Sequence, residues 1–376
     1  MIVFVSNFVS PHIIPLCDEL YRLHNHDFLF VETMRMSTER KDLGYNQLRN
    51  RKYVIAFEEY SAHQSDYQKV INEASVVLAS FASVDNKILY NRIKENNITF
   101  LLSERIFKKG IIKLIDSRFW KNLFFIQRIK NKNFHLLCMG AYVAQDFSLC
   151  GFKKEKMWKF GYITKRKENH ISIQIEDRLD EIVRLIWIGR MIWWKHPFHV
   201  IKAAKKIKKK GIKFTLHMIG GGKLEEKIKK YLTKVNISEI SYHGLMKNSQ
   251  VGYMMTKVDV LVCTSNRLEG WGAVINEGMN AGCLVVANEK MGATSYLIKN
   301  KITGYSYRGG VKELTQTLIE VIGNKDLKKI ARNGYQYIRE YWNAEIAAQR
   351  LLYLISEIKN GTLCSDIYED GICSKA

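Results

Sequence analysis

Two glutamates eight positions apart are the residues whose type and spacing point most directly to chemistry. Glu269 and Glu277 lie in the stretch RLEGWGAVINEGMNAG, in a chain whose formal net charge is +22. Glu269 follows the apolar run VDVLVCTS through a short connection, so we expect it at the carboxyl edge of a sheet. Glu277 lies about one turn into the next helix, on the face that holds Asn276 and Asn280. Such carboxylates accept hydrogen bonds from vicinal hydroxyls, as on a sugar, although a surface glutamate and a helix-stabilising glutamate would give the same spacing.

The loop between the two glutamates is suited to an anion. Gly270 and Gly272 flank Trp271, and glycine lets backbone amides approach a ligand closely. The helix that begins near Ala273 directs its positive end to the same spot. We therefore expect a phosphate to bind against these amides.

A basic turn lies earlier in the same half of the chain. The stretch GRMIWWKHP places Arg190 directly after Gly189 at a strand end, with Lys195 five residues further on. Arginine as a bidentate fork and lysine as a point charge can neutralise a diphosphate without a metal. In a chain this rich in lysine, a solvated basic turn is the alternative. The glycine turn from Gly220 to Gly222 is weaker, because a lone glycine run is more often a tight turn than a phosphate cradle.

These residues need a scaffold, and the sequence alternates strands and helices twice. We expect strands over 1–7, 27–33, 74–80, 98–104, 134–140, 183–190, 213–222, 240–244, 258–265 and 282–288. We expect helices over 13–23, 85–96, 196–211, 223–235 and 311–323. Continuous apolar strands separated by helices predict parallel sheets that are covered on both faces. Two such doubly wound, Rossmann-like domains in tandem would face a central cleft with the carboxyl ends of both sheets.

The bulk composition excludes several classes of protein. At 376 residues, with 47% hydrophobic and 26% charged residues, the chain fits two globular domains and not a disordered protein. No apolar run approaches the roughly 18–20 residues that cross a bilayer. The N-terminus reads as a first strand and not as a signal peptide. The seven cysteines form no Cys-x-x-Cys pair, so reduced, mostly buried thiols are favoured over a disulfide or zinc framework.

Taken together, these motifs resemble a known family. GRMIWWK, MIGGG, SYHG and EGWGAVINEGMNAGCLVVAN follow the order and spacing of group 1 retaining glycosyltransferases of the GT-B fold. The resemblance covers about 184–307 and is most specific in the Glu-x7-Glu and Gly-Arg-x4-Lys elements. The first half resembles the amino-terminal domain of a bacterial surface-polysaccharide subgroup. The resemblance implies the following organisation: an acceptor-side domain over 1–165, a linker over 166–180, a nucleotide-sugar-binding domain over 181–340, a helix over 341–360 that crosses back to the first domain, and a flexible tail over 361–376.

The resemblance also implies roles for single residues. Arg190 and Lys195 would bind the diphosphate of a nucleotide-sugar and stabilise the leaving group, Glu269 would hold a hydroxyl of the donor sugar, and Glu277 would hold the ribose. Further donor-binding residues would be Gly189, Gly220, Gly222, Gly244, Gly270, Trp271, Gly272 and Ala273. In the first domain, His12 would orient a substrate near the reacting carbon, and Glu104 and Arg105 would line the acceptor side.

Three positions depart from the family pattern. His196 stands where the family usually has glycine after the lysine, Gly292-Ala293 replaces a glycine pair, and Tyr296 stands where many members have glutamate. These departures leave glycosyl transfer plausible but make the identity of the sugar unreadable.

The implied function is metal-independent, cofactor-free transfer of a hexose, with retention, from a UDP-, GDP- or ADP-sugar to a glycan or polyprenyl-linked acceptor in surface polysaccharide synthesis. We expect a cytoplasmic protein that is peripheral on the inner face of the membrane if the basic amphipathic segment 107–133 binds anionic lipid. An ordinary core-packing helix with a solvated basic side is the alternative for that segment.

Two other functions stay open. Another GT-B enzyme, such as a nucleotide-sugar epimerase, would turn over the donor without an acceptor. A nucleic-acid-binding protein is indicated by charge alone, and the sequence contains no zinc-finger, helix-turn-helix or ribonucleoprotein signature. We therefore expect no nucleic-acid partner.

Overall fold

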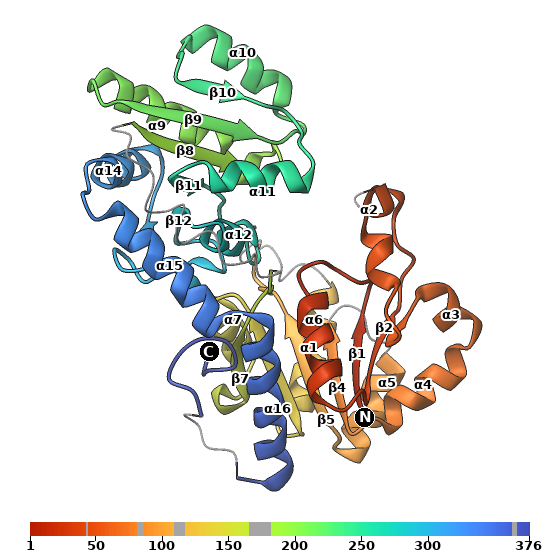
Figure 1. Cartoon of the computed structure of the whole chain (residues 1–376). Helices are drawn as coiled ribbons and strands as arrows, with labels where there is room; N and C mark the ends of the chain where they lie inside the picture. The colour runs from red at the N-terminus through yellow and green to blue at the C-terminus, as the bar shows by residue number, and fades with distance from the viewer. Residues whose placement is uncertain (43, 81–85, 109–116, 165–181, 363–366) are drawn as a thin grey trace. The chain divides into compact units, whose positions relative to one another are not determined.

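The computed structural model describes residues 1–42, 44–80, 86–108, 117–164, 182–362 and 367–376. The chain divides into two compact units (Figure 1). Unit 1 combines Met1–Lys165 with Tyr341–Ala376, and unit 2 is Arg166–Glu340. The predicted linker over 166–180 lies outside the described residues.

Unit 1 is built on a seven-stranded parallel sheet with the order β3-β2-β1-β4-β5-β6-β7. Its strands are β1 (Ile2–Ser6), β2 (Phe28–Glu32), β3 (Val54–Ile55), β4 (Val76–Ser80), β5 (Ile98–Ser103), β6 (Phe134–Met139) and β7 (Met157–Phe160). The winding direction reverses between β1 and β4. In such sheets the crevice at this reversal, outside the carboxyl ends of the strands, is the usual binding place.

The helices of unit 1 are mostly short and amphipathic. They are α1 (Ile14–Leu23), α2 (Thr38–Asp42), η1 (Tyr45–Arg49), α3 (Phe57–Ala62), α4 (Gln64–Glu73), α5 (Asn86–Glu95), α6 (Ser117–Ile129), α7 (Val143–Leu149), η3 (Lys154–Lys156) and α16 (Ala344–Asn360). Although far apart in the sequence, α1 and α16 pack against each other (Figure 1). The chain's last long helix therefore covers the element that follows its first strand.

Unit 2 is built on a six-stranded parallel sheet with the order β10-β9-β8-β11-β12-β13. Its strands are β8 (Val183–Ile188), β9 (Phe214–Ile219), β10 (Ile240–Tyr242), β11 (Val260–Cys263), β12 (Leu284–Asn288) and β13 (Tyr305–Tyr307). Its helices are η4 (Trp193–Lys195), α9 (Pro197–Lys209), α10 (Glu225–Val235), α11 (Asn248–Thr256), α12 (Val274–Asn280), α13 (Thr294–Leu297), α14 (Val311–Ile322) and α15 (Leu327–Tyr341). The reversal here lies between β8 and β11.

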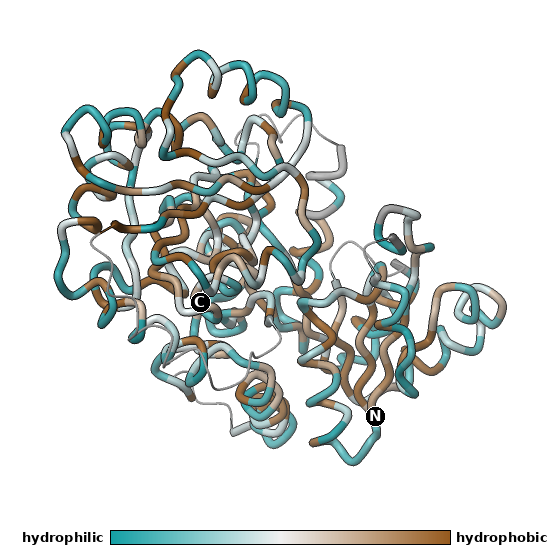
Figure 2. Tube along the Cα trace, turned by 45° about the horizontal axis from the view of Figure 1, so that its top comes forward, coloured by the Kyte–Doolittle hydropathy of each residue, from teal (hydrophilic) through white to brown (hydrophobic). Residues whose placement is uncertain are grey.

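Each unit has its own hydrophobic core around its sheet. Figure 2 shows the hydrophobic residues concentrated along the strands, with hydrophilic residues over much of the outer helices. Strands buried on both faces read as continuous apolar runs, and β4, β5 and β6 follow this rule. The prediction of two doubly wound α/β domains is confirmed.

The end of the chain corrects one prediction. A flexible tail is the wrong description for residues 367–376, because Ile372 and Cys373 are fully buried. The Cys373 amide donates to the Lys159 carbonyl (2.8 Å), and the Lys159 amide donates to the Ser374 carbonyl (2.7 Å). Trp158 and Lys375 form an antiparallel bridge. The tail thus pairs with the exposed edge of β7, which a sheet otherwise leaves open to other chains.

The structure describes only part of the segment 107–133, which was predicted either to bind a membrane or to pack against the core. In α6, Ile126 and Ile129 are buried, whereas Trp120 and Phe124 are exposed. Arg128 lies over the Phe124 ring, 4.8 Å from its centroid. Lipid binding by 107–133 stays a prediction. No helix among the described residues is long and apolar enough to span a bilayer.

Candidate functional site

The carboxyl ends of β8 and β11 bring two of the predicted residues into contact. Lys195 ends the short turn η4 after β8, and Glu269 lies in the loop after β11. The Lys195 ammonium and the Glu269 carboxylate form an ion pair, and both side chains are mostly buried, with 14% and 19% of their area exposed. The carboxylate thus neutralises a cation that would otherwise stand unpaired in a mostly buried place.

Hydrogen bonds join the two loops that carry this pair. The Thr264 hydroxyl, at the end of β11, donates to the Lys195 carbonyl (2.5 Å) and accepts from Trp187 Nε1 (2.8 Å). The Asn266 amide donates to the Trp194 carbonyl (2.9 Å), and the Glu269 amide donates to the Asn266 carbonyl (3.0 Å). Lys195 and Glu269 are therefore held by backbone geometry and not only by their mutual attraction.

The residue between the turn and α9 has an unusual backbone. His196 has a φ of 48°, in the left-handed region, which glycine adopts without steric cost and other residues rarely adopt. Its Nε2 lies 3.2 Å from Asn266 Nδ2, and its ring stacks on His199 with centroids 4.4 Å apart. The position therefore needs the conformation that the family's usual glycine provides, and side-chain contacts hold the histidine in it.

Arg190 stands on the same turn without a counter-charge. Its side chain is exposed, and its guanidinium lies 5.8 Å from the centroid of the Trp194 ring. No carboxylate in the described part of the chain lies within ion-pair distance of it. The turn therefore has one cation held by Glu269 and one that is open to a ligand.

The glycine loop after Glu269 offers unused donors. The amides of Gly270 and Gly272 donate to no residue that the structure describes. Gly272 has a φ of 96°, and a Cβ there would come within 2.6 Å of Met291. Ala273 is the N-cap of α12. An anion at this loop would meet free N–H groups and the positive end of a helix dipole.

The Trp271 ring is 1% exposed, and its Nε1 donates to Asn276 Oδ1 (2.8 Å), so the ring is a core element. The donor contact expected of Trp271, through the backbone amides of this loop, stays a prediction. The predicted face of the following helix is wrong. Asn276 and Asn280 are buried, and only Glu277 of the three is partly exposed. The helix lies so close to β11 that a Cβ on Gly278 would come within 2.3 Å of Leu261. The close contact between α12 and β11 decides which face of the helix is buried. Helical periodicity alone does not reveal that contact.

The remaining predicted glycines allow three loops to approach one another. The Gly220 amide donates to the Gly244 carbonyl (2.8 Å), so it is not free to bind a phosphate. A Cβ on Gly220 would lie 1.9 Å from the Gly189 carbonyl oxygen, and one on Gly222 would lie 3.1 Å from the Met191 carbonyl oxygen. These glycines position the ends of β8, β9 and β10, and any contact that they make with a nucleotide stays a prediction.

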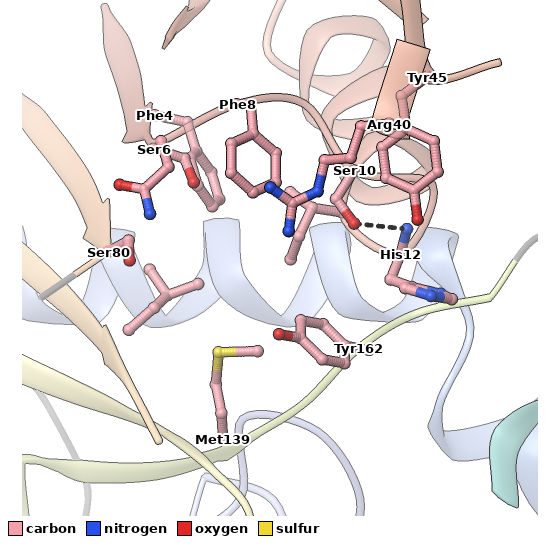
Figure 3. A pocket seen from close by; sticks show the side chains of 13 residues that line it. Phe4, Ser6, Phe8, Ser10, His12, Arg40, Tyr45, Ser80, Met139 and Tyr162 are labelled. Atoms are coloured by element: carbon pink, nitrogen blue, oxygen red, sulfur yellow. Dashed lines mark hydrogen bonds between the residues drawn. The ribbon is translucent and has the colours of Figure 1, made fainter. Parts of the chain in front are cut away.

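Unit 1 has a pocket of about 300 Å³ at the carboxyl ends of β1, β4, β5 and β6 (Figure 3). It is lined by Phe4, Ser6, Asn7, Phe8, Ser10, His12, Ile13, Arg40, Tyr45, Ser80, Leu102, Met139 and Tyr162. Of these, sequence reasoning singled out only His12. The others come from distant segments, and no local spacing marks them as members of one site.

His12 lies at the margin of this pocket. Its amide donates to Ser10 Oγ (3.3 Å), its carbonyl accepts from the Ile163 amide (2.9 Å), and its ring lies 5.4 Å from the Tyr162 ring. Burial lowers the pKa of His12 below its usual value, so the imidazole is neutral at physiological pH. A neutral imidazole can accept or donate a hydrogen bond but adds no positive charge.

Glu104 and Arg105 lie beside the pocket and do not line it. Arg105 is committed to Asp146 through two hydrogen bonds of 3.3 and 3.0 Å. Glu104 forms an ion pair with Lys108 and accepts from the Tyr162 hydroxyl (3.4 Å). Glu104 thus reaches the pocket only through the tyrosine, and the acceptor-side role of both residues stays a prediction.

Residues 171–337 match the family described as glycosyl transferases group 1. An uncharacterised glycosyltransferase of Methanocaldococcus jannaschii, MJ1178, is 30% identical over 38% of this chain and 41% of its own length. The amylovoran biosynthesis glycosyltransferase AmsK of Erwinia amylovora is 21% identical over 68% of this chain and 58% of its own length. The matches to these curated relatives thus span about half of the relatives' length.

Among solved structures, Anabaena HepE in complex with UDP is similar along nearly the whole chain. It has a TM-score of 0.70 and 15% identity, and the match covers 95% of this chain and 99% of HepE. At this identity the likeness concerns the fold. The chain therefore has the GT-B fold, and residues 171–337 are similar to the glycosyl transferases group 1 family.

Proposed function

We propose that this chain is a retaining glycosyltransferase that moves a hexose from a nucleotide-sugar to a glycan or lipid-linked acceptor in cell-surface polysaccharide synthesis. The observation that carries the proposal is the arrangement of charge at the carboxyl edge of the unit 2 sheet. There, the Lys195–Glu269 pair, the open guanidinium of Arg190 and the free amides of Gly270 and Gly272 belong to adjoining loops. These are the groups that a diphosphate and a sugar hydroxyl require.

The chemical step needs stabilisation of the leaving group. When the nucleoside diphosphate departs, negative charge develops on its β-phosphate oxygens, and preorganised cations and amides there lower the barrier. Arg190 and Lys195 supply that charge without a metal ion. As the phosphate engages Lys195, Glu269 is released to accept a hydrogen bond from a hydroxyl of the sugar. The acceptor hydroxyl attacks the anomeric carbon on the face from which the nucleoside diphosphate departs. The new carbon–oxygen bond forms as the bond to the β-phosphate oxygen breaks, and the hydroxyl proton passes to the departing phosphate, so the configuration at the anomeric carbon is retained.

The comparisons support a uridine nucleotide as the first donor to test. HepE was crystallised with UDP and with UDP-glucose, and AmsK is named for amylovoran biosynthesis. The GT-B fold is shared with HepE along nearly its whole length. We therefore propose a UDP-sugar donor and a polysaccharide precursor as the product.

The deciding experiment is calorimetric titration of UDP into the wild type, Lys195→Met and Lys205→Met. Lys205 is exposed on α9, so its replacement removes the same charge at a distance from the site. We expect Lys195→Met to weaken UDP binding about tenfold or more, the loss of one charge-assisted contact, and Lys205→Met to bind as the wild type does. Equal affinities in all three proteins would refute the proposal.

A further inference from the structure

Among the residues that the structure describes, the pocket of unit 1 is lined by one permanent cation and by no carboxylate. Of its thirteen lining residues, Arg40 alone is permanently charged, because His12 is held neutral by burial. Phe4, Phe8, Tyr45 and Tyr162 supply aromatic surface, and Leu102, Met139 and Ile13 supply aliphatic surface. At about 300 Å³, the pocket is at the small end of ligand sites. It fits a compact ligand with an apolar face and one negative charge.

Arg40 is held in place by an aromatic ring and not by an acid. Its guanidinium lies 3.6 Å from the centroid of the Phe8 ring. No carboxylate that the structure describes lies within ion-pair distance of Arg40. Figure 3 shows the side chain crossing Phe8 toward the middle of the group of lining residues. A guanidinium stacked in this way keeps its in-plane N–H donors for a partner that accepts two hydrogen bonds, such as a carboxylate or a phosphate.

The pocket also has polar groups suited to hydroxyls. The side-chain oxygen of Asn7 is buried and accepts no hydrogen bond from the described part of the chain, which costs free energy until a donor arrives. Three residues with hydroxyl groups, Ser6, Ser10 and Ser80, also line the pocket. A sugar ring satisfies these groups with its hydroxyls and can place its C–H face on the aromatic rings.

The loop that carries Asn7 and Phe8 is fixed from behind by a buried acid. Glu32, at the end of β2, is fully buried. One of its oxygens accepts from the Val9 amide (2.8 Å), and the other forms an ion pair with Arg49 (2.5 Å). Because Glu32 is engaged by these partners, it leaves the charge of Arg40 for a ligand. The loop is therefore preorganised before the ligand binds.

We propose that this pocket binds a sugar residue that carries an anionic group, a carboxylate or a phosphate, with Arg40 as the residue that selects the charge. The assignment of this sugar as the acceptor of the transfer rests on the proposed function. The acceptor would then be an acidic or phosphorylated glycan end, and a neutral glycan would be a poor substrate.

The test measures binding of three probes to the whole protein without nucleotide: methyl β-glucuronide, glucose 6-phosphate and methyl β-glucoside. We expect the wild type to bind at least one anionic probe about tenfold or more tightly than the neutral glucoside, the worth of one charge-assisted pair. The stronger of the two anionic probes identifies the group as a carboxylate or a phosphate. Equal binding of all three probes, or binding of none, would overturn the proposal.

Two variants and a matched control make the test specific to Arg40. Arg40→Gln should abolish the preference for charge, and Arg40→Lys should retain part of it, because lysine keeps the charge and loses the fork. Arg35→Gln removes the same charge from an exposed neighbouring position and should behave as the wild type. Loss of preference in Arg35→Gln, or its persistence in Arg40→Gln, would contradict the assignment.

A parallel titration with UDP separates this inference from the proposed function. We expect Arg40→Gln to bind UDP as the wild type does, which also shows that the variant is folded. If the anionic probes bind and UDP does not, the pocket assignment stands and the transferase proposal fails. If Arg40→Gln weakens UDP binding to the extent seen in Lys195→Met, the pocket is part of a nucleotide site and the sugar assignment is wrong.

Discussion

Glu269 and Glu277 share a motif but differ in their surroundings. Glu269 is paired with Lys195 and mostly buried, whereas Glu277 is partly exposed one turn into α12. Removing Glu269 frees the Lys195 ammonium, which can still bind the diphosphate of a nucleotide. Removing Glu277 takes away the carboxylate proposed to hold the ribose.

We therefore predict opposite effects for two alanine variants. Glu277→Ala should weaken UDP binding about tenfold, and Glu269→Ala should bind UDP as well as the wild type or better. With UDP-glucose and an acceptor, Glu269→Ala should lower turnover by about 10²-fold or more. Calorimetry and initial-rate measurements check the two halves separately, and wild-type behaviour of both variants would remove the functional reading of the motif.

The spacing of residues along the chain identifies some members of the two candidate sites and misses others. Lys195 and Glu269 each follow a long apolar strand by a short turn, so the sequence places both at a sheet edge. Arg40 and Tyr162 have no such local signal, because only the folded sheet brings α2 and the segment after β7 to the same pocket. The Gly-Trp-Gly loop does not reveal that the Trp271 indole is buried and bonded to Asn276.

Among the elements, the turn between η4 and α9 holds a histidine in a left-handed conformation. This backbone costs a residue with a Cβ about 1–2 kcal/mol, and a β-branched side chain suffers most. His196→Gly and His196→Val lose the same imidazole contacts. We predict that the valine variant unfolds with a free energy about 1–2 kcal/mol below that of the glycine variant, measured by urea denaturation. Equal stability of the two would show that the backbone at 196 relaxes.

A second prediction concerns β6, β7 and the tail. His135 on β6 is 3% exposed, its Nδ1 accepts from Trp158 Nε1 (3.4 Å), and its Nε2 faces Asn133 Oδ1 at 3.3 Å. Burial, with smaller contributions from Lys156 and Lys375, lowers the pKa of His135 to about 3. The folded protein therefore holds this imidazole neutral between about pH 6.5 and 3, whereas the unfolded chain takes up a proton.

It follows that His135 lowers the free energy of unfolding as the pH falls through that window. The contribution is complete above about pH 6.5 and is lost by up to about 1.4 kcal/mol per pH unit toward pH 3. We predict that His135→Gln loses less stability than the wild type between pH 6.5 and 4, measured by urea unfolding at each pH. His63→Gln, which removes an exposed histidine, should keep the wild-type slope, and parallel slopes for all three proteins would contradict the prediction.

Most strands could be predicted from the sequence, and the three that were missed have a common cause. The ten expected strands are all present, and all but the three-residue β10 are apolar runs long enough to be read alone. The short edge strands β3, β7 and β13 have two to four residues and are defined by their neighbours more than by their own pattern. The break between α15 and α16 depends on one cap, Asn343, whose side chain accepts from the Ile346 amide.

For the whole molecule, the important feature is that two separate cores share one chain. Leu351 on α16 is fully buried, in the helix that packs against α1 within unit 1. Leu351→Ala should therefore destabilise unit 1 by about 2–5 kcal/mol and leave the core of unit 2 intact. We predict that calorimetric heating of this variant lowers one transition only, and that UDP still raises the other. A uniform shift of both transitions would show that the units unfold as one.

The division of unit 1 between the two ends of the sequence has a consequence for synthesis. A ribosome must translate the 175 residues of unit 2, from 166 to 340, before it makes the helix that covers α1. At about 5–20 residues per second, the nascent first half waits roughly 9–35 seconds with that apolar face uncovered. The need for chaperones during translation should therefore fall on the half that is made first, although it is the last to be completed.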